Sequence, residues 1–199
     1  AARFALMHLE QAPPPLEAGR LTVADRWILS RLARVAREVT EHLEAYRFNE
    51  AASALYQFTW HAFCDWYLEA AKPALYAQDD TAARDGARAT LGRVLRDLLV
   101  LLHPFVPFVT EEIWHKLPGT DGSIMAALFP VDAAEAGGFR DPAAEATMDL
   151  LIRVITGIRN IRGEMNVAPS LKLRVLLASD EKGALETLEK GRGYIENLA

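Results

Sequence analysis

Helical periodicity, broken at proline and capping signals, dominates residues 1–119 and limits the folds open to them. After Thr22, apolar residues recur at intervals of three and four, so they form one stripe along a helix. Asp25 follows Thr22 by three residues, which is the spacing of an N-terminal capping box. Several such helices joined by short links bury their stripes against one another, so these residues predict an antiparallel helix bundle. The predicted helices cover residues 2–10, 23–43, 49–72, 81–102 and 111–117.

Local signals set the ends of these helices. The proline-rich stretch QAPPPLEAGR cannot continue the first helix, so we expect a linker there. Asn49 is expected to cap the third helix, and Pro73 is expected to stop it. Trp27 is expected to anchor the core of the bundle, with its neighbouring arginine at the helix end, and core packing is one of two interpretations for Phe48.

The pattern changes after Gly119, and residues 120–199 predict a small α/β appendage to the mainly α bundle of 1–119. SIMAALFP and LKLRVLLAS predict short strands, the second because it alternates with period two at its start. AAEAGGF predicts a loop, and Asp141 with Pro142 opens a predicted helix that ends near Arg162. Asp180 is expected to cap a last pair of short helices.

Composition narrows the possible classes of protein. The net charge of −5 argues against indiscriminate nucleic-acid binding but leaves room for a local basic face. The longest apolar run, LLVLLHPFVPFV, contains a histidine and two prolines, so no segment approaches the roughly 20 residues that cross a bilayer. One cysteine cannot form an internal disulfide and fits a reducing compartment, so we expect a cytoplasmic protein without a membrane partner.

Catalytic and metal signatures are weak in this sequence. It contains no glycine-rich phosphate loop, zinc signature or nucleophile elbow. His61 and Cys64 lie three residues apart on one helix, but two ligands are too few for structural zinc. We therefore expect neither a catalytic residue, nor a metal, nor a cofactor in this chain.

Aromatic side chains beside arginines point instead to RNA, whose unpaired bases stack on flat side chains. The neighbours are Arg3 with Phe4, Arg26 with Trp27, and Arg47 with Phe48. Core packing is the competing interpretation, and it is favoured for Trp27. The stretch GIRNIRGEMNV adds Arg159 and Arg162, which either contact an RNA backbone or pair with Glu164.

The order of several motifs resembles the C-terminal region of the valyl-tRNA synthetases. The resemblance covers nearly the whole chain, through ADRWILSRL, EAYRFNEAASALYQF, FCDWYLEAAKPAL, HPFVPFVTEEIWHKL, SIM and IRNIRGEMNV. HPFVPFVTEEIW is shared with the related isoleucyl and leucyl enzymes, whereas FCDWYLEAAKP and IRNIRGEMNV resemble the valine family specifically.

The resemblance implies a helical anticodon-binding domain of the class I synthetase type, with tRNA(Val) as partner. Phe4 is expected to stack on an anticodon base, and Leu68 to make an apolar contact with a base. Arg3, Trp66 and Lys72 join them as candidates by proximity, and Arg159 and Arg162 complete the candidate set. The ATP-site signatures HIGH and KMSKS are absent, so ATP and the ligase reaction are expected in a missing catalytic domain.

The chain lacks an initiator methionine and a signal peptide, so we expect an excised piece of a longer ligase. Three other hypotheses stay open on the sequence alone. The first is the corresponding domain of an isoleucyl or leucyl enzyme. The second is a helical protein-interaction module without an RNA role, and the third is a free-standing metalloenzyme.

Overall fold

Helices and loops make up the described residues, which are 1–130, 139–168 and 170–199 of the computed structural model. No strand occurs within these ranges, and the mainly α class is confirmed. None of the helices in the same ranges is both long and apolar enough to cross a membrane. The chain divides into two compact units, Ala1–Pro142 and Ala143–Ala199. The division therefore falls after Pro142, whereas the sequence prediction drew it after residue 119.

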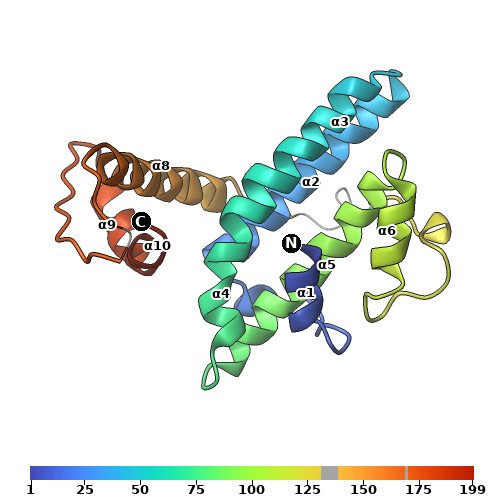
Figure 1. Ribbon diagram of the computed structural model, residues 1–199, viewed down its shortest axis with the longest axis horizontal. Coiled ribbons are helices and arrows are strands. Elements are labelled where there is room, and N and C mark those ends of the chain that lie inside the picture. Colours follow the sequence, from blue (N-terminus) through green and yellow to red (C-terminus); the bar gives the residue numbers. More distant parts are fainter. Residues whose placement is uncertain (131–138, 169) are drawn as a thin grey trace. The chain divides into compact units, whose positions relative to one another are not determined.

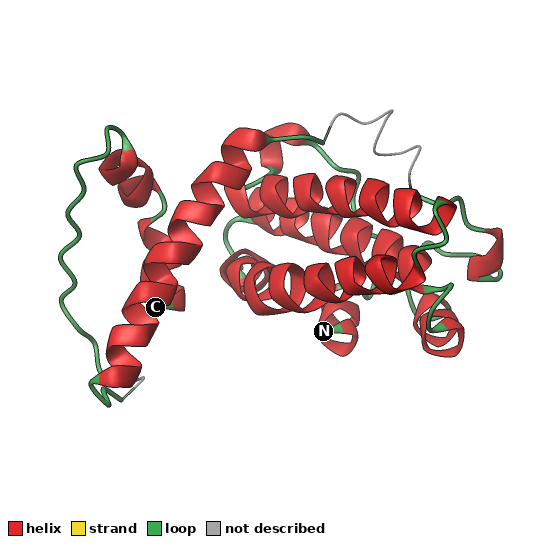
Figure 2. Ribbon diagram, turned by 90° about the horizontal axis from the view of Figure 1, so that it is seen from above, coloured by secondary structure: helices red, strands yellow, loops and turns green. Residues whose placement is uncertain are grey.

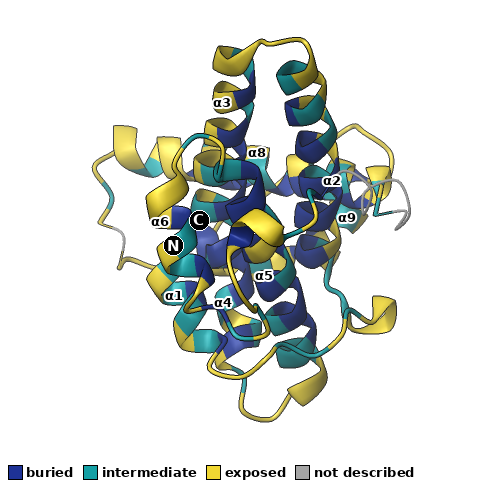
Figure 3. Cartoon of the chain, turned by 90° about the vertical axis from the view of Figure 1, so that its right-hand side faces the viewer, coloured by how far each residue is buried: buried dark blue, intermediate teal, exposed yellow. Residues whose placement is uncertain are grey.

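Three long helical rods form the core of the first unit (Figure 1). They are α2 (Val23–Glu44), the continuous run of α3 (Phe48–Gln57), η2 (Phe58–Tyr67) and α4 (Leu68–Tyr76), and α5 (Thr81–Leu102). Short turns join the rods into antiparallel hairpins, which lie side by side in Figure 2. Their facing sides carry the buried residues, drawn dark blue in Figure 3. The predicted antiparallel bundle is confirmed.

Four shorter elements surround the rods. They are α1 (Ala2–His8), η1 (Ala18–Arg20), α6 (Pro107–Trp114) and η3 (Ile124–Ala126). The strand predicted for SIMAALFP is wrong, because this segment contains the 3-10 turn η3. The Ser123 hydroxyl accepts a hydrogen bond from the Met125 amide at 3.2 Å, and such a local side-chain bond stabilises a turn rather than a strand.

A buried carboxylate joins α2 to the central rod. The predicted capping box is confirmed: the Thr22 hydroxyl accepts from the Asp25 amide at 3.2 Å, and Asp25 Oδ2 accepts from the Thr22 amide at 2.9 Å. The second carboxylate oxygen, Oδ1, accepts a 2.8 Å bond from the Tyr67 hydroxyl. Asp25 and Tyr67 are both buried, so these bonds replace the water that each polar group loses.

The middle of the central rod, η2, is a π-helix, which is wider than an α-helix and is bonded from residue i to residue i+5. At its start the Thr59 hydroxyl donates to the Leu55 carbonyl at 2.6 Å and so occupies an acceptor of the preceding α-helical turn. At its end the Leu68 amide donates to the Phe63 carbonyl, five residues back. The wider turns place Phe63 and Tyr67 together in the core, with their rings stacked at 6.1 Å.

The predicted stop at Pro73 is wrong, because α4 runs through this proline to Tyr76. A proline inside a helix removes one backbone hydrogen bond, at a cost of about 3 kcal/mol. The residues on either side are buried, namely Ala70, Ala71 and Leu75, and their packing offsets that loss. Tertiary contacts here outweigh the local signal.

The start of α3 also differs from the prediction. The helix begins at Phe48 with Arg47 in the cap position, and no side chain caps it, so Asn49 lies inside the first turn. Phe48 is 54% exposed and packs edge-on against Tyr46, so it does not anchor the core. Trp27 is buried, as expected.

The second unit contains α8 (Pro142–Glu164), α9 (Ala184–Lys190) and α10 (Arg192–Leu198). The helix predicted to open at Asp141 and Pro142 and the last helix pair are both confirmed. Leu151 and Ile155 of α8 are buried, as are Leu188 and Leu198 of the last pair. Gly191 separates α9 from α10, and a methyl group there would overlap the end of the Leu151 side chain, which would have to shift.

The predicted α/β appendage is not found among the described residues. LKLRVLLAS is extended but pairs with no other strand, and all its residues are exposed. Asp180 does not cap α9: Gly183 occupies that position with a φ of +83°, which favours glycine. The loop predicted for AAEAGGF falls largely in 131–138, outside the described residues.

We predict that Tyr67→Phe lowers the free energy of unfolding by about 1.5 to 3 kcal/mol, because Asp25 then keeps a buried, charged oxygen without its donor. Urea unfolding of the 199-residue chain measures the change. Tyr56→Phe is the matched control, since Tyr56 is exposed and should tolerate the same loss. Equal stability of the two variants would show that the Asp25–Tyr67 bond does not stabilise the fold.

Candidate nucleic-acid interface

Helix α1 is fixed against α4 and α5, and it presents the first candidate residues. Ala5 and Leu9 are fully buried and form its contact face. The Arg88 guanidinium on α5 donates from Nε to the His8 carbonyl at 3.0 Å, which satisfies an acceptor at the end of α1. The His8 ring also lies 5.0 Å from the Tyr76 ring of α4. These contacts fix where the exposed side of α1 faces.

The linker after α1 crosses α5 at a glycine. A Cβ atom at Gly92 would come within 2.6 Å of Pro13 Cγ, a distance that real contacts do not allow. The neighbouring Leu9 side chain would also be touched, at 3.6 Å. The small residue therefore lets the proline-rich linker pass directly over α5, and the predicted linker is confirmed in its position after α1.

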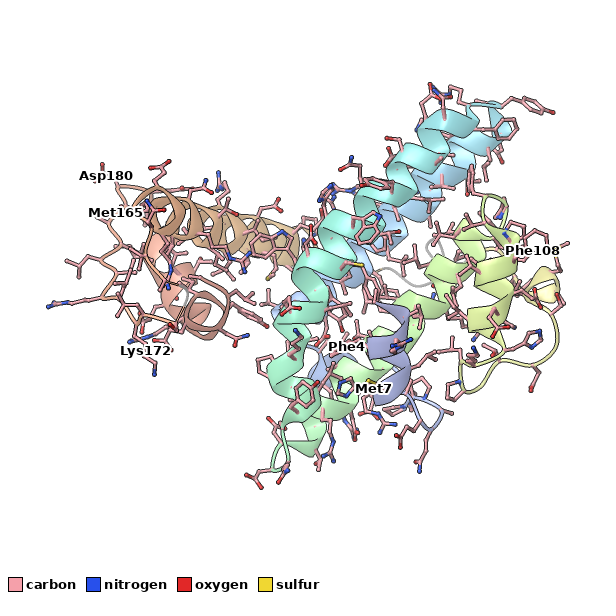
Figure 4. All side chains as sticks on the ribbon, in the orientation of Figure 1. Phe4, Met7, Phe108, Met165, Lys172 and Asp180 are labelled. Atoms are coloured by element: carbon pink, nitrogen blue, oxygen red, sulfur yellow. The ribbon has the colours of Figure 1, made fainter. Side chains whose placement is uncertain are left out.

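Phe4 and Lys72 meet at the junction of α1 and α4. The Phe4 ring, labelled in Figure 4, is half-buried. The Lys72 ammonium lies 5.8 Å from its centroid, and the His8 ring lies 4.8 Å away. Both carboxylate oxygens of Glu69 accept from Lys72 Nζ, at 2.6 and 2.7 Å. The structure thus brings together two candidate residues that are 68 positions apart in sequence.

The other first-unit candidates have different environments. Arg3 is exposed on α1, next to Phe4. Trp66 is half-buried near the end of η2. Leu68 is only 6% exposed, and its side chain packs in the core at the start of α4. In this arrangement Leu68 supports the junction from within and contacts a ligand only after a local rearrangement.

Arg159 and Arg162 belong to the second unit, and each forms hydrogen bonds inside it. Arg159 Nε donates to the Leu198 carbonyl at 2.6 Å, which ties α8 to the end of α10. Arg162 donates to the carbonyls of Ala168 and Leu171, at 2.8 and 3.1 Å. These hydrogen bonds give both arginines a structural role, which was not predicted from the sequence.

The sequence analysis also missed three residues at the junction, which are His8, Glu69 and Tyr76. Two of them had a usable signal, because side chains three or four residues apart on a helix are neighbours. His8 follows Phe4 by four residues, and Glu69 precedes Lys72 by three. The contact of Tyr76 with His8 joins two helices and had no such signal.

The junction offers the rings of Phe4 and Tyr76, the Lys72 ammonium and the His8 imidazole, which suit stacking and hydrogen bonding. Burial, and then the charge of Arg88, lower the pKa of His8.

Elsewhere, burial is the main cause that raises the pKa of Cys64, so its thiol is a poor nucleophile. In the described ranges no group of three or more possible metal ligands is assembled, and His61 bonds to Asp65 at 3.2 Å.

Comparison with known proteins identifies the class. Residues 25–177 match the family described as the anticodon-binding domain of tRNA ligase. The match covers most of the chain, including the whole three-rod bundle from Asp25 onward. The chain therefore belongs to this family.

Individual relatives narrow the class further. The chain is 51% identical to the valine–tRNA ligase of Geobacter sulfurreducens over its full length and covers 22% of that protein. It is 46% identical to the enzyme of the same name from Desulfotalea psychrophila over 92% of this chain, covering 21% of that protein. It is 40% identical to the valine–tRNA ligase of Bacillus thuringiensis over its full length and covers 22% of that protein. The chain thus spans about a fifth of the length of these relatives.

We predict that acid weakens the docking of α1. The pKa of His8 is lowered in the folded chain, so the unfolded chain binds more protons, and stability falls as the pH drops through the ordinary value of 6.5. The Nε2 atom of His8 is buried and has no hydrogen-bond partner in the described structure, so nothing there stabilises a charged ring. Melting temperatures from about pH 7.5 to about pH 5.5 should fall further for the wild-type chain than for His8→Gln. Equal decreases would contradict this role of His8.

Proposed function

We propose that this chain is the anticodon-binding portion of a valine–tRNA ligase and that the α1–α4 junction contacts the anticodon loop of tRNA(Val). The observation that carries the proposal is 40–51% identity to valine–tRNA ligases over 92–100% of the chain. Identity of this level across the bundle supports the same role for the same helices.

The junction has the chemistry that an unpaired loop requires. Bases in single-stranded RNA stack on flat side chains, and the half-buried Phe4 ring offers such a surface with restricted motion. Lys72 supplies a positive charge directly beside the ring, for a phosphate or a base edge. Glu69 holds the ammonium in place, so little side-chain freedom is lost on binding.

Binding at this junction serves a reaction that happens elsewhere in the proposed full-length enzyme. Contacts to remote parts of a substrate supply free energy that positions its reacting end. The catalytic domain, its ATP and the amino acid belong to the remaining length of such a ligase, and cytoplasmic translation is its setting. Arg3 lies on the exposed side of α1 and is positioned to extend the contact along the RNA backbone.

The alternative hypotheses have less support. The relatives reported above act on valine by name, which favours the valine enzyme over the isoleucyl and leucyl enzymes. Membership of the anticodon-binding family favours RNA over a protein-only interaction module. Two observations argue against a metal at His61 and Cys64. His61 forms a hydrogen bond with Asp65, and the pKa of the Cys64 thiol is raised, which disfavours the thiolate that binds metals.

We predict that Phe4→Ala in the full-length ligase raises the KM for tRNA(Val) by roughly ten- to a hundredfold. The reason is the loss of about 1–3 kcal/mol of stacking free energy. Aminoacylation kinetics measure this KM, and valine-dependent pyrophosphate exchange should stay unchanged because it does not need tRNA. Phe108→Ala is the matched control, since Phe108 is a 91% exposed aromatic on α6. An unchanged KM for the Phe4 variant would sink its role as a stacking surface.

A second prediction concerns Lys72. If its ammonium neutralises a phosphate, Lys72→Gln should reduce the salt dependence of tRNA binding by about 0.7 to 0.9 in the slope of log K against log salt. Filter binding at a series of salt concentrations gives this slope. Lys116→Gln is the control, because Lys116 is also a lysine paired with a glutamate close to it in the sequence. Identical slopes for wild type and Lys72→Gln would place the ammonium away from phosphate.

A further inference from the structure

Three aromatic rings form a continuous row at the α1–α4 junction, and the function proposed above assigns a base only to the first of them. The His8 ring lies 4.8 Å from the Phe4 ring and 5.0 Å from the Tyr76 ring, measured between centroids. His8 therefore contacts both of the other rings, one on α1 and one at the last residue of α4. The Phe4 and Tyr76 rings are thus separated by a single imidazole.

The Tyr76 side chain is exposed, but the backbone that carries it is held in place. Tyr76 is 60% exposed, whereas Leu75 directly before it is buried in the bundle. On the other side, the Ala77 carbonyl accepts a hydrogen bond from Arg84 Nη1 of α5 at 3.2 Å. A large ring that stands in water on a fixed backbone can bind a ligand at a low cost in conformational entropy.

The angle between the rings leaves a face of Tyr76 available. The His8 and Tyr76 planes meet at 78°, which is an edge-on contact. In such a contact the edge of one ring points at the face of the other, so His8 covers at most one of the two tyrosine faces. Together with the exposure of the residue, this means that a flat apolar surface is open beside the Phe4 ring.

The spacing of the two rings suits neighbouring nucleotides of an unpaired strand. Successive bases of single-stranded RNA stack on successive aromatic side chains, and the bases of a loop can be splayed apart to reach them. Lys72 precedes Tyr76 by four residues on α4, so the two side chains are neighbours on one side of the helix. The ammonium that lies 5.8 Å from the Phe4 ring is therefore placed for the phosphate that links two such nucleotides.

We propose that the Tyr76 ring stacks on the nucleotide next to the one that stacks on Phe4, so that the junction binds two consecutive unpaired nucleotides. This inference rests on the proposed function, because Phe4 defines the position from which the second nucleotide is counted. Every base has an aromatic face, so stacking on Tyr76 adds affinity and holds the loop open without selecting a particular base.

Binding of tRNA(Val) to the full-length ligase tests this inference by filter binding. Tyr76→Leu, which replaces the ring by an apolar side chain, should weaken binding at least about fivefold, and Tyr76→Phe, which keeps the ring, should not. The measurement is repeated with a single abasic nucleotide placed at each position of the anticodon loop in turn. The loss caused by Tyr76→Leu should vanish at one abasic position, adjacent to the position where the loss caused by Phe4→Ala vanishes.

Tyr56→Leu is the matched control for the loss of an exposed tyrosine ring. Tyr56 is 56% exposed, and it also meets a histidine edge-on, since its ring centroid lies 6.2 Å from that of His61 at an angle of 75°. This variant should bind tRNA(Val) as the wild-type ligase does.

The position at which each loss vanishes separates a direct contact from an indirect one. If both losses vanish at the same abasic position, Tyr76 only supports Phe4 through His8, and the inference is overturned while the proposed function stands. Wild-type affinity of Tyr76→Leu, or a loss that persists at every abasic position, overturns it in the same way. Wild-type affinity of Phe4→Ala contradicts the proposed contact at the junction, and the inference fails with it.

Discussion

The Asp25 carboxylate fixes how the helices of the bundle sit along one another. One of its oxygens completes the cap of α2, and the other accepts the Tyr67 hydroxyl from the π-helix of the central rod. A buried carboxylate is costly unless its acceptors are used, so displacing either helix along its axis leaves charge without a partner. Apolar packing alone tolerates small slides of one helix past another, whereas this hydrogen bond requires a fixed distance and direction between its two atoms.

The candidate interface depends on that alignment. Lys72 lies five residues after Tyr67 on the same rod, and it meets Phe4 only because α1 docks beside α4. A helix of seven residues is not stable on its own, so α1 owes its conformation to Ala5, Leu9 and the Arg88 bond. The aromatic ring and the ammonium are thus preorganised by residues that have no contact with a ligand.

Local signals predicted the helices well and failed where distant contacts decide the conformation. The capping box at Thr22 and the helix start at Pro142 each depend only on residues within four positions of one another. Such local signals can be found from the sequence alone. Pro73 misled because buried neighbours on α4 outweigh its missing amide. In the candidate site, Phe4 was selected through a family resemblance and Lys72 by proximity, but the contact between them was not predicted. Arg159 and Arg162 show the converse, since their carbonyl partners lie in segments that no helical spacing reveals.

The π-helix Phe58–Tyr67 determines how far the residues after it are rotated about the axis of the central rod. Its ten residues are wound more loosely than an α-helix, so it holds surplus chain that a regular helix would not need. If the same ten residues wound as regular α-helix, they would turn further about the rod axis, and everything that follows would rotate with them. Glu69 and Lys72 would then face away from α1, although neither had been altered. The widened turn therefore sets the rotational position from which α4 meets its neighbour.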